Sequence, residues 1–182
     1  MKGQVVVSCA ILAVHCAAAG QSETGKPAVP PSCEAPEYRQ FDFWIGDWDV
    51  TTANGQPAGR NTITRVANGC ALHENWVGRG GFTGQSLNGW NRHTKLWQQT
   101  WLDSSGARLD LAGAADATGL QLEGRVPRGN GRDGLLMHRI RWSRLPDGRV
   151  RQHWETSEDS GANWVTAFDG YYQRRGPETT RP

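Results

Sequence analysis

The sequence predicts an all-β protein, an up-and-down antiparallel β-barrel of about ten strands. Three observations favour this class. Short segments that alternate apolar and polar residues recur roughly every 8–14 positions, separated by turn residues. The 182 residues include 23 glycines and nine tryptophans but only two methionines. No amphipathic helix longer than a turn or two is evident. Closure into a barrel removes the exposed edges of such a meander, and a sandwich of two sheets is the alternative.

The expected strands are defined by the turns between them. Asn54-Gly55, Asn68-Gly69 and Asp147-Gly148 are pairs that supply positive φ at little cost. Together with six further stretches of turn residues they make nine expected turns, which separate ten strands. The short connections favour antiparallel pairing of strands that are neighbours along the chain. We expect strands at residues 48–52, 60–66, 70–77, 82–90, 96–102, 108–112, 120–125, 135–143, 149–156 and 164–173.

Residues 1–20 have the pattern of a signal peptide. Lys2 precedes an apolar stretch at residues 5–14, and small residues at 17–20 offer a cleavage site. The stretch is too short to span a membrane as a stable helix. We therefore expect a periplasmic or secreted protein. The expected parts of the chain are a signal peptide at 1–20, a leader at 21–37, a β-barrel domain at 38–174 and a flexible tail at 175–182.

The four cysteines divide between the signal peptide and the mature chain. Lipidation at Cys9 or Cys16 is an alternative to simple cleavage, although His15 fits a lipidation signal poorly. Cys33 and Cys70 remain after cleavage and can pair in only one way in an oxidising compartment. Such a disulfide would close a loop of about 38 residues and stabilise the fold by roughly 4 kcal/mol. Two free thiols are the alternative.

Composition and motifs argue against several classes of function. A net charge of +2 is not the large positive excess that binding of a polyanion requires, so we expect no nucleic-acid partner. A mean hydropathy of −0.63 with a single apolar run argues against a membrane span. The chain has no phosphate-binding loop and no Gly-x-Ser-x-Gly motif, and His73, His93 and His153 lack metal-ligand spacing. We expect no metal and no cofactor, and the oligomeric state stays open.

One face of several expected strands combines large aromatic residues with an amide, hydroxyl or carboxylate. Trp97, Gln99 and Trp101, for example, share a face because side chains alternate along a strand. A buried polar group left unpaired costs about 1–3 kcal/mol, so a cavity for a small-molecule ligand explains this mixture better than a plain core. The alternative is that the tryptophans fill the barrel and the polar groups satisfy one another. The candidate ligand-binding residues are Glu74, Trp76, Ser86, Asn88, Trp97, Gln99, Trp101, His138, Trp142 and Trp154.

Glu74 and His138 are the candidates for catalysis in the same cavity. A carboxyl group in an apolar pocket has a raised pKa, and it can act as a general acid or base in a small-molecule hydrolase or isomerase. His138, Arg139 or Asn88 would assist. Pairing of Glu74 with Arg139 or Arg141 is the structural alternative, and a plain hydrogen-bonding role is the alternative for His138.

Residues 157–164 carry a turn motif. Ser157, Asp159, Gly161 and Trp164 match Ser-x-Asp-x-Gly-x-x-Trp, which resembles the Asp-box of sialidase-like repeats. In that motif the Asp and Ser side chains bond turn amides while the Trp packs behind the hairpin. Propellers repeat the motif in each blade, whereas here it occurs once. The resemblance therefore implies the turn and not sialidase activity.

Residues 41–48, Phe-Asp-Phe-Trp-Ile-Gly-Asp-Trp, contain a Gly-x-Trp tripeptide similar to the one that opens the lipocalin (calycin) barrel. Further motifs are Gly69-Cys70, Glu74-x-Trp76, Gly84-x-Ser86 and Trp97-x-Gln99-x-Trp101-x-Asp103. Together they resemble, over residues 41–172, a family of uncharacterised exported bacterial lipocalin-like proteins. The resemblance implies a calycin-type barrel with Trp48 plugging one end. It implies no activity, substrate or catalytic residue.

Overall fold

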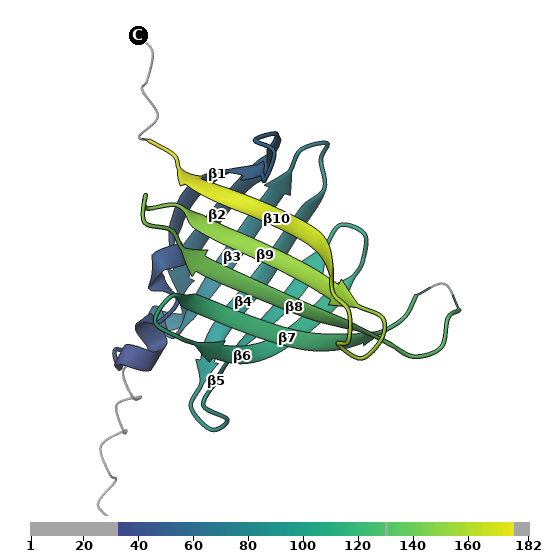
Figure 1. The fold of residues 1–182 in the computed structure, drawn as a ribbon. Helices are drawn as coiled ribbons and strands as arrows, with labels where there is room; N and C mark the ends of the chain where they lie inside the picture. Colours follow the sequence, from purple (N-terminus) through teal and green to yellow (C-terminus); the bar gives the residue numbers. More distant parts are fainter. Residues whose placement is uncertain (1–32, 130, 177–182) are drawn as a thin grey trace, which may run out of the picture. The chain divides into compact units, whose positions relative to one another are not determined.

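The protein is described from a computed structural model, which defines residues 33–129 and 131–176. Ten β-strands follow one another along this part of the chain (Figure 1). They are β1 Gly46–Thr52, β2 Pro57–Val66, β3 Ala71–Gly78, β4 Thr83–Asn91, β5 Leu96–Asp103, β6 Arg108–Ala115, β7 Gly119–Pro127, β8 Leu135–Arg144, β9 Val150–Ser157 and β10 Val165–Arg174. Three short 3-10 helices accompany them: η1 Pro36–Arg39, η2 Asp42–Trp44 and η3 Ala67–Gly69.

The strands form one closed barrel in which each pairs antiparallel with its neighbours in sequence. β1 and β10 close the ring, with Trp48 opposite Arg174 and Thr52 opposite Gly170. The predicted up-and-down barrel of ten strands is confirmed. The two-sheet sandwich is excluded, because the ladder of described strands is continuous around the ring.

Several strands are longer than the sequence predicted, and β2, β6 and β7 are each longer by three residues. β6 continues to Ala115 because Gly113 allows a close approach of β7, where a Cβ on Gly113 would lie 2.0 Å from the Gln121 carbonyl oxygen. Small residues have a weak strand preference, so the pattern gave no signal for this extension. β2 begins at Pro57, since a proline is tolerated as the first residue of a strand.

One end of the barrel is closed by the residues that precede β1 (Figure 1). η1 and η2 bring Phe41 and Trp44 into the core, where neither side chain is exposed. The Phe41 ring stacks on Trp44 at 4.7 Å between centroids and meets the Trp142 ring edge-on at 5.2 Å. Trp48 is 1% exposed, and its Nε1 donates to the Trp44 carbonyl at 2.8 Å. These aromatic side chains fill what we call the closed end.

The predicted disulfide between Cys33 and Cys70 is present. It links the chain before η1 to the residue before β3, across 37 positions of sequence. Arg39 supports the same junction, because its guanidinium donates to the carbonyl oxygens of Cys33 and Gly69. In the chain-entropy view, closing a loop of this length stabilises the fold by about 4 kcal/mol. The link fastens the segment that covers the closed end.

The opposite end, which we call the open end, carries the β1–β2, β3–β4, β5–β6, β7–β8 and β9–β10 connections. In the β3–β4 connection Gly80 and Gly81 have φ of +92° and +88°, a backbone conformation that favours glycine. A Cβ on either would meet no described atom within 4 Å, so the space beside these two glycines is open.

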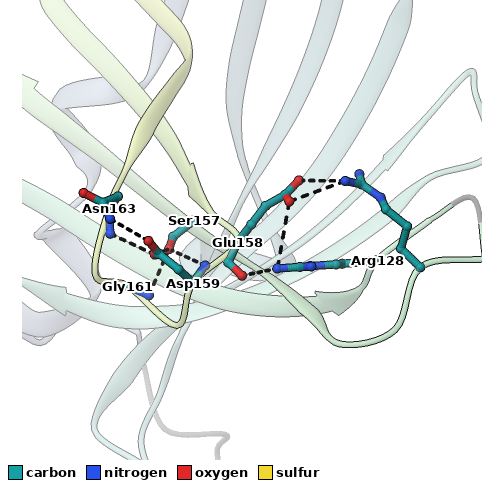
Figure 2. Close-up of polar contacts among 7 residues, drawn as sticks. Arg128, Ser157, Glu158, Asp159, Gly161 and Asn163 are labelled. Carbon is teal, nitrogen blue, oxygen red and sulfur yellow. Dashed lines mark hydrogen bonds and ion pairs between the residues drawn. The ribbon is translucent and has the colours of Figure 1, made fainter.

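The β9–β10 hairpin at the open end has the hydrogen bonds that its sequence motif predicts (Figure 2). Asp159 accepts from the backbone N–H and the side-chain amide of Asn163, at 2.8 and 2.7 Å. Ser157 Oγ accepts from the Gly161 N–H at 2.9 Å. Trp164 packs behind the turn, and its Nε1 donates to the Gly161 carbonyl at 3.0 Å. The Asp and Ser side chains therefore fix the shape of the turn.

The β7–β8 connection is bonded to this hairpin. Arg128 donates to the Glu158 carbonyl oxygen and lies 3.9 Å from the Glu158 carboxylate (Figure 2). Arg132 lies 3.3 Å from the same carboxylate. Two adjacent loops of the open end thus hold each other in place.

The predicted signal peptide at residues 1–20, with the lipidation alternatives at Cys9 and Cys16, lies outside the described residues. Most of the predicted leader and tail lies outside them too. Among the residues that are described, no helix has the length and apolar character needed to cross a membrane.

Candidate functional site

Side-chain alternation brings the ten candidate ligand-binding residues inside the barrel, and all ten are buried or half-buried. On three adjacent strands, Glu74 of β3, Ser86 of β4 and Trp101 of β5 are register partners and share one level. The ten residues then separate along the barrel axis. Some face a cavity toward the open end, and the others lie in a polar layer or in the closed-end core.

The cavity has a volume of about 320 Å³. This lies at the lower end of the range for small-molecule sites, roughly 300–1,000 Å³. Five candidates line it: Glu74, Trp76, Gln99, Trp101 and Trp154. The lining is completed by Ala58, Gly78, Arg79, Phe82, Leu109, Ile140, Gln152, Ala167, Phe168 and Tyr172. Arg79 and Phe82 are exposed on the β3–β4 connection, so the cavity reaches solvent there.

Two tryptophans of the cavity wall pack closely against glycines on a neighbouring strand. At Gly84 of β4 a Cβ would lie 2.1 Å from Cζ2 of Trp101, and at Gly59 of β2 a Cβ would lie 2.8 Å from the Trp76 ring. A side chain at either glycine would occupy the space of the indole, so glycine allows each ring to lie close to the wall. Trp101 is held further by its Nε1, which donates to Asp103 at 3.1 Å.

Trp154 and Phe168 supply the remaining large rings of the wall. Phe168 meets Trp76 in a T-shaped arrangement with 6.1 Å between ring centroids. Trp154 donates through Nε1 to Nδ1 of His138 at 3.0 Å. The four large rings, Trp76, Trp101, Trp154 and Phe168, line a single cavity, and we call them the aromatic wall.

His138 is buried but does not line the cavity. Its Nδ1 accepts the Trp154 bond, which in the neutral ring places the proton on Nε2. Nε2 has no hydrogen-bond partner within the described part of the chain. Burial lowers the pKa of His138, so the ring is neutral near pH 7. His138 thus positions Trp154, and it is not placed to touch a molecule in the cavity.

The floor of the cavity is a polar layer centred on Glu74, which is 4% exposed. Glu74 Oε1 accepts from Asn61 Nδ2 at 2.7 Å, and Oε2 accepts from Ser86 Oγ at 2.6 Å. Behind Ser86, Asn88 donates to the Ser86 hydroxyl at 2.8 Å, and Gln99 donates to Asn88 Oδ1 at 2.7 Å. In this series of hydrogen bonds each donor is directed toward the Glu74 carboxylate. Hydrogen bonding therefore favours the ionised form of Glu74.

Tyr172 joins the layer from β10. Its hydroxyl accepts from Asn61 at 3.3 Å and donates to Oε1 of Gln152. Burial raises the pKa of the Tyr172 phenol well above its ordinary value, and the charge of Glu74 acts in the same direction. The hydroxyl therefore stays protonated near neutral pH and remains a hydrogen-bond donor.

Burial raises the pKa of Glu74 from 4.5 to about 7, because the charged carboxylate loses its hydration inside the barrel. The hydrogen bonds from Ser86 and Asn61 and the charge of His73 lower the pKa but are smaller effects. None of the ion pairs found among the described residues includes Glu74. The hydrogen bonds to the carboxylate therefore all come from neutral donors.

The arginines considered as partners of Glu74 form ion pairs elsewhere. Arg139 lies 2.8 Å from Glu155, and Arg141 lies 2.8 Å from Asp116. Both adjoin the inward residues of β8 and, because side chains alternate, lie on the opposite face of that strand. Neither arginine therefore forms an ion pair with Glu74. Arg139 is also not placed to assist chemistry in the cavity, contrary to the expectation above.

Trp97, Trp142, Ser86 and Asn88 do not line the cavity. Trp97 and Trp142 are 1% and 0% exposed in the closed-end core, and Trp97 Nε1 donates to Gln40 at 3.1 Å. Ser86 and Asn88 lie in the polar layer behind Glu74. Tryptophans therefore fill the closed end, as one alternative expected, while those of the aromatic wall leave space between them.

The lining residues that sequence reasoning missed include three kinds. Leu109 and Ile140 are apolar residues on inward faces, and nothing in the sequence separates them from ordinary core. Gln152 shares its face with Trp154 and could have been found by the aromatic-plus-amide criterion. Arg79 and Phe82 lie at the β3–β4 connection, where alternation gives no direction for a side chain.

Within residues 33–129 and 131–176, no three His, Cys, Asp or Glu side chains are grouped so as to hold a metal ion. A comparison with models of known protein families finds no match, and a comparison with curated proteins finds none either. The function is therefore argued from the cavity and its residues.

Replacement Gly84→Ala should displace the Trp101 ring. The new Cβ would lie 2.1 Å from that ring, and overpacking of this kind destabilises a fold by about 1–3 kcal/mol. Urea unfolding would measure the loss, and tryptophan emission would report the ring movement. Gly89→Ala in the same strand is the matched control, because its nearest atom would be 3.7 Å away. Equal effects of the two substitutions would contradict the close packing described here.

The raised pKa of Glu74 should make stability depend on pH. Between about pH 4.5 and 7 the native state keeps a proton that the unfolded chain has released. The free energy of unfolding therefore falls as pH rises through this window, on the order of 3 kcal/mol in total. Urea unfolding at several pH values should show this fall in the wild type and not in Glu74→Gln. The exposed Glu123→Gln should behave like the wild type, and identical slopes for all three proteins would refute the buried-acid description.

Proposed function

We propose that this protein is a small-molecule-binding β-barrel that takes a partly apolar ligand into the cavity at its open end. The observation that carries the proposal is the cavity itself, about 320 Å³ with an aromatic wall and a buried carboxyl group in its floor. Apolar walls with a few placed polar groups are typical of sites that bind and orient small ligands.

The contrast between the two ends of the barrel supports a ligand site. At the closed end the rings of Trp44 and Trp142 pack against each other and Trp48 packs against Tyr172, and all three tryptophans are almost completely buried. At the open end Trp76, Trp101 and Trp154 are only half-buried and share a cavity with Glu74. A barrel that needed aromatic residues only for packing would gain more stability by filling both ends.

We further propose that the protein is exported and works in the periplasm or outside the cell. The Cys33–Cys70 disulfide supports an oxidising compartment, and residues 1–20 have the pattern of a signal peptide. The motif around Trp48 and the closed antiparallel barrel support kinship with exported lipocalin-like proteins. The natural ligand would then be a compound met outside the cytoplasm.

A second candidate function is acid–base catalysis by Glu74, as in a small-molecule hydrolase or isomerase. It is favoured by a carboxyl group that lines the cavity and has a pKa of about 7, near the pH at which such an enzyme would work. His138 and Asn88 are not placed to touch a substrate, so Glu74 would act with the amides of Gln99 and Gln152.

The binding function predicts a small molecule in the cavity of protein purified from its own source. Native mass spectrometry should show an added small mass, and Trp101→Ala should retain less than about a tenth of it, because the ligand loses an apolar wall. Trp164→Ala is the control, since Trp164 packs behind the β9–β10 hairpin and does not line the cavity. Equal retention by the two variants would show that the molecule binds elsewhere, and a bare wild-type mass would count against the function.

The enzymatic candidate makes a different prediction for Glu74→Gln. Loss of the acid–base group should lower turnover of a test ester such as p-nitrophenyl acetate by about a hundredfold or more. The wild-type rate should also change with pH through about 7. Glu123→Gln on the outer surface serves as the control. Turnover no faster than in buffer, or unchanged in Glu74→Gln, would leave binding as the only function of the site.

A further inference from the structure

Glu74 is a buried acid that forms no ion pair with any described residue, and the only positive charge that acts on it, that of His73, has a small effect. The ion pairs of the described chain form between other residues, and Glu74 receives only the amide of Asn61 and the hydroxyl of Ser86. Neutral donors offset only part of the cost of burying a carboxylate. A cation entering the cavity would remove that cost, because Glu74 lies in the cavity lining.

The groups around Glu74 also have an excess of hydrogen-bond acceptors. Both carboxylate oxygens accept, and Asn61 Oδ1 in the same layer is buried with no donor in the described part of the chain. Gln152 Oε1, in the cavity lining, accepts from Tyr172. Of these acceptors, Glu74 and Gln152 line the cavity, so a ligand that carries several N–H donors would bond their remaining lone pairs there.

The aromatic wall suits the same kind of ligand. The faces of tryptophan rings carry partial negative charge and attract ammonium groups, more strongly when the site excludes water. Trp76 lies two residues from Glu74 on the same inward face of β3, and Trp101 lies level with Ser86, which bonds Glu74. The carboxylate and these rings therefore face one volume.

We propose that the ligand is a protonated amine with an apolar or aromatic body, whose ammonium group binds against Glu74 while its body lies along the aromatic wall. This inference rests on the proposed binding function and names the class of ligand. The amine would supply the positive charge that Glu74 lacks and donors for the acceptors of the floor.

The competing possibility is an anionic ligand, because Arg79 places a positive charge at the mouth of the cavity. An anionic ligand would place its charge near this guanidinium and would leave Glu74 protonated at the floor. Arg79 is exposed on the β3–β4 connection, so water and salt screen its charge, whereas the charge of Glu74 is buried. The deeper part of the cavity therefore selects for a cation.

The pH dependence of binding follows from the groups that face Glu74. Asn61 of β2, Ser86 of β4 and Gln152 of β9 do not titrate, and the Tyr172 phenol of β10 stays protonated near neutral pH. The remaining ionisable groups nearby are His73, which neighbours Glu74 in β3 and bonds Gln85, the inward His138 of β8, and Arg79 at the mouth. An amine must displace the Glu74 proton below about pH 7, so its affinity should fall by up to about tenfold per pH unit there.

The test compares three probes that share one ring and differ in charge: 2-phenylethylamine, 2-phenylethanol and phenylacetate. Calorimetric titration of the wild-type chain at about pH 8 should show the amine binding at least about tenfold more tightly than either of the others. Glu74→Gln should remove this preference and bind the neutral alcohol as the wild type does, which also shows that the variant is folded. Glu123→Gln should retain the preference.

A second measurement needs no variant. At about pH 6.5 the binding of the amine should release a proton from Glu74, so the apparent enthalpy should differ between two buffers with different heats of ionisation. The alcohol should release none. Tight binding of the amine with no proton release would overturn the assignment of its site to Glu74.

The outcomes separate the inference from the function on which it rests. If the alcohol or phenylacetate binds and the amine binds no better, the protein is a small-molecule binder and the cation inference is wrong. If phenylacetate alone binds, and Arg79→Gln abolishes its binding, the site is for anions. If none of the three probes binds, both the inference and the proposed function are contradicted.

Discussion

The desolvation of one carboxylate is the constraint on which the interior of this barrel depends. Glu74 sits where ten strands exclude water, and the hydrogen bonds to its carboxylate come from neutral donors. Those donors come from β2 and β4, and further amides of β4 and β5 orient them. Burial still outweighs their effect on the pKa. Burial of the Glu74 carboxylate therefore has an electrostatic cost that the polar layer does not fully offset. Ionisable groups whose pKa is shifted in this way are commonly found at functional sites.

This layer also explains why the two halves of the barrel use the same residue type so differently. Below it, indole rings pack against one another and against Phe41, with interplanar angles from stacked to edge-on. Above it, Trp76 and Trp101 lie against glycines and so leave the axis of the barrel free. A tryptophan below the Glu74 layer therefore fills the core, whereas a tryptophan above that layer with a glycine beside it lines the cavity.

Most of the fold could be predicted from the sequence, because turn residues and alternation are local signals. All ten strands were expected, and alternation divides each strand into two faces, but which face points inward does not follow from alternation. Depth along the barrel axis could not be predicted, since Trp97 and Trp101 have the same pattern in sequence and only the covering segment at the closed end distinguishes them. Arg79 lies in a turn, and its place at the mouth depends on how the strands are staggered around the ring.

The bonds between the β7–β8 and β9–β10 loops make the rim of the open end unequal around its circumference. Arg128 and Arg132 fasten one side through Glu158, in addition to the internal bonds of the hairpin. The β1–β2, β3–β4 and β5–β6 turns instead have glycines with nothing packed against their Cα atoms, at Gly55, Gly80, Gly81 and Gly106. Deformation of the rim therefore costs less on the side of these three turns than at the two joined loops. The proposed ligand would enter and leave on that side, where Arg79 and Phe82 border the cavity.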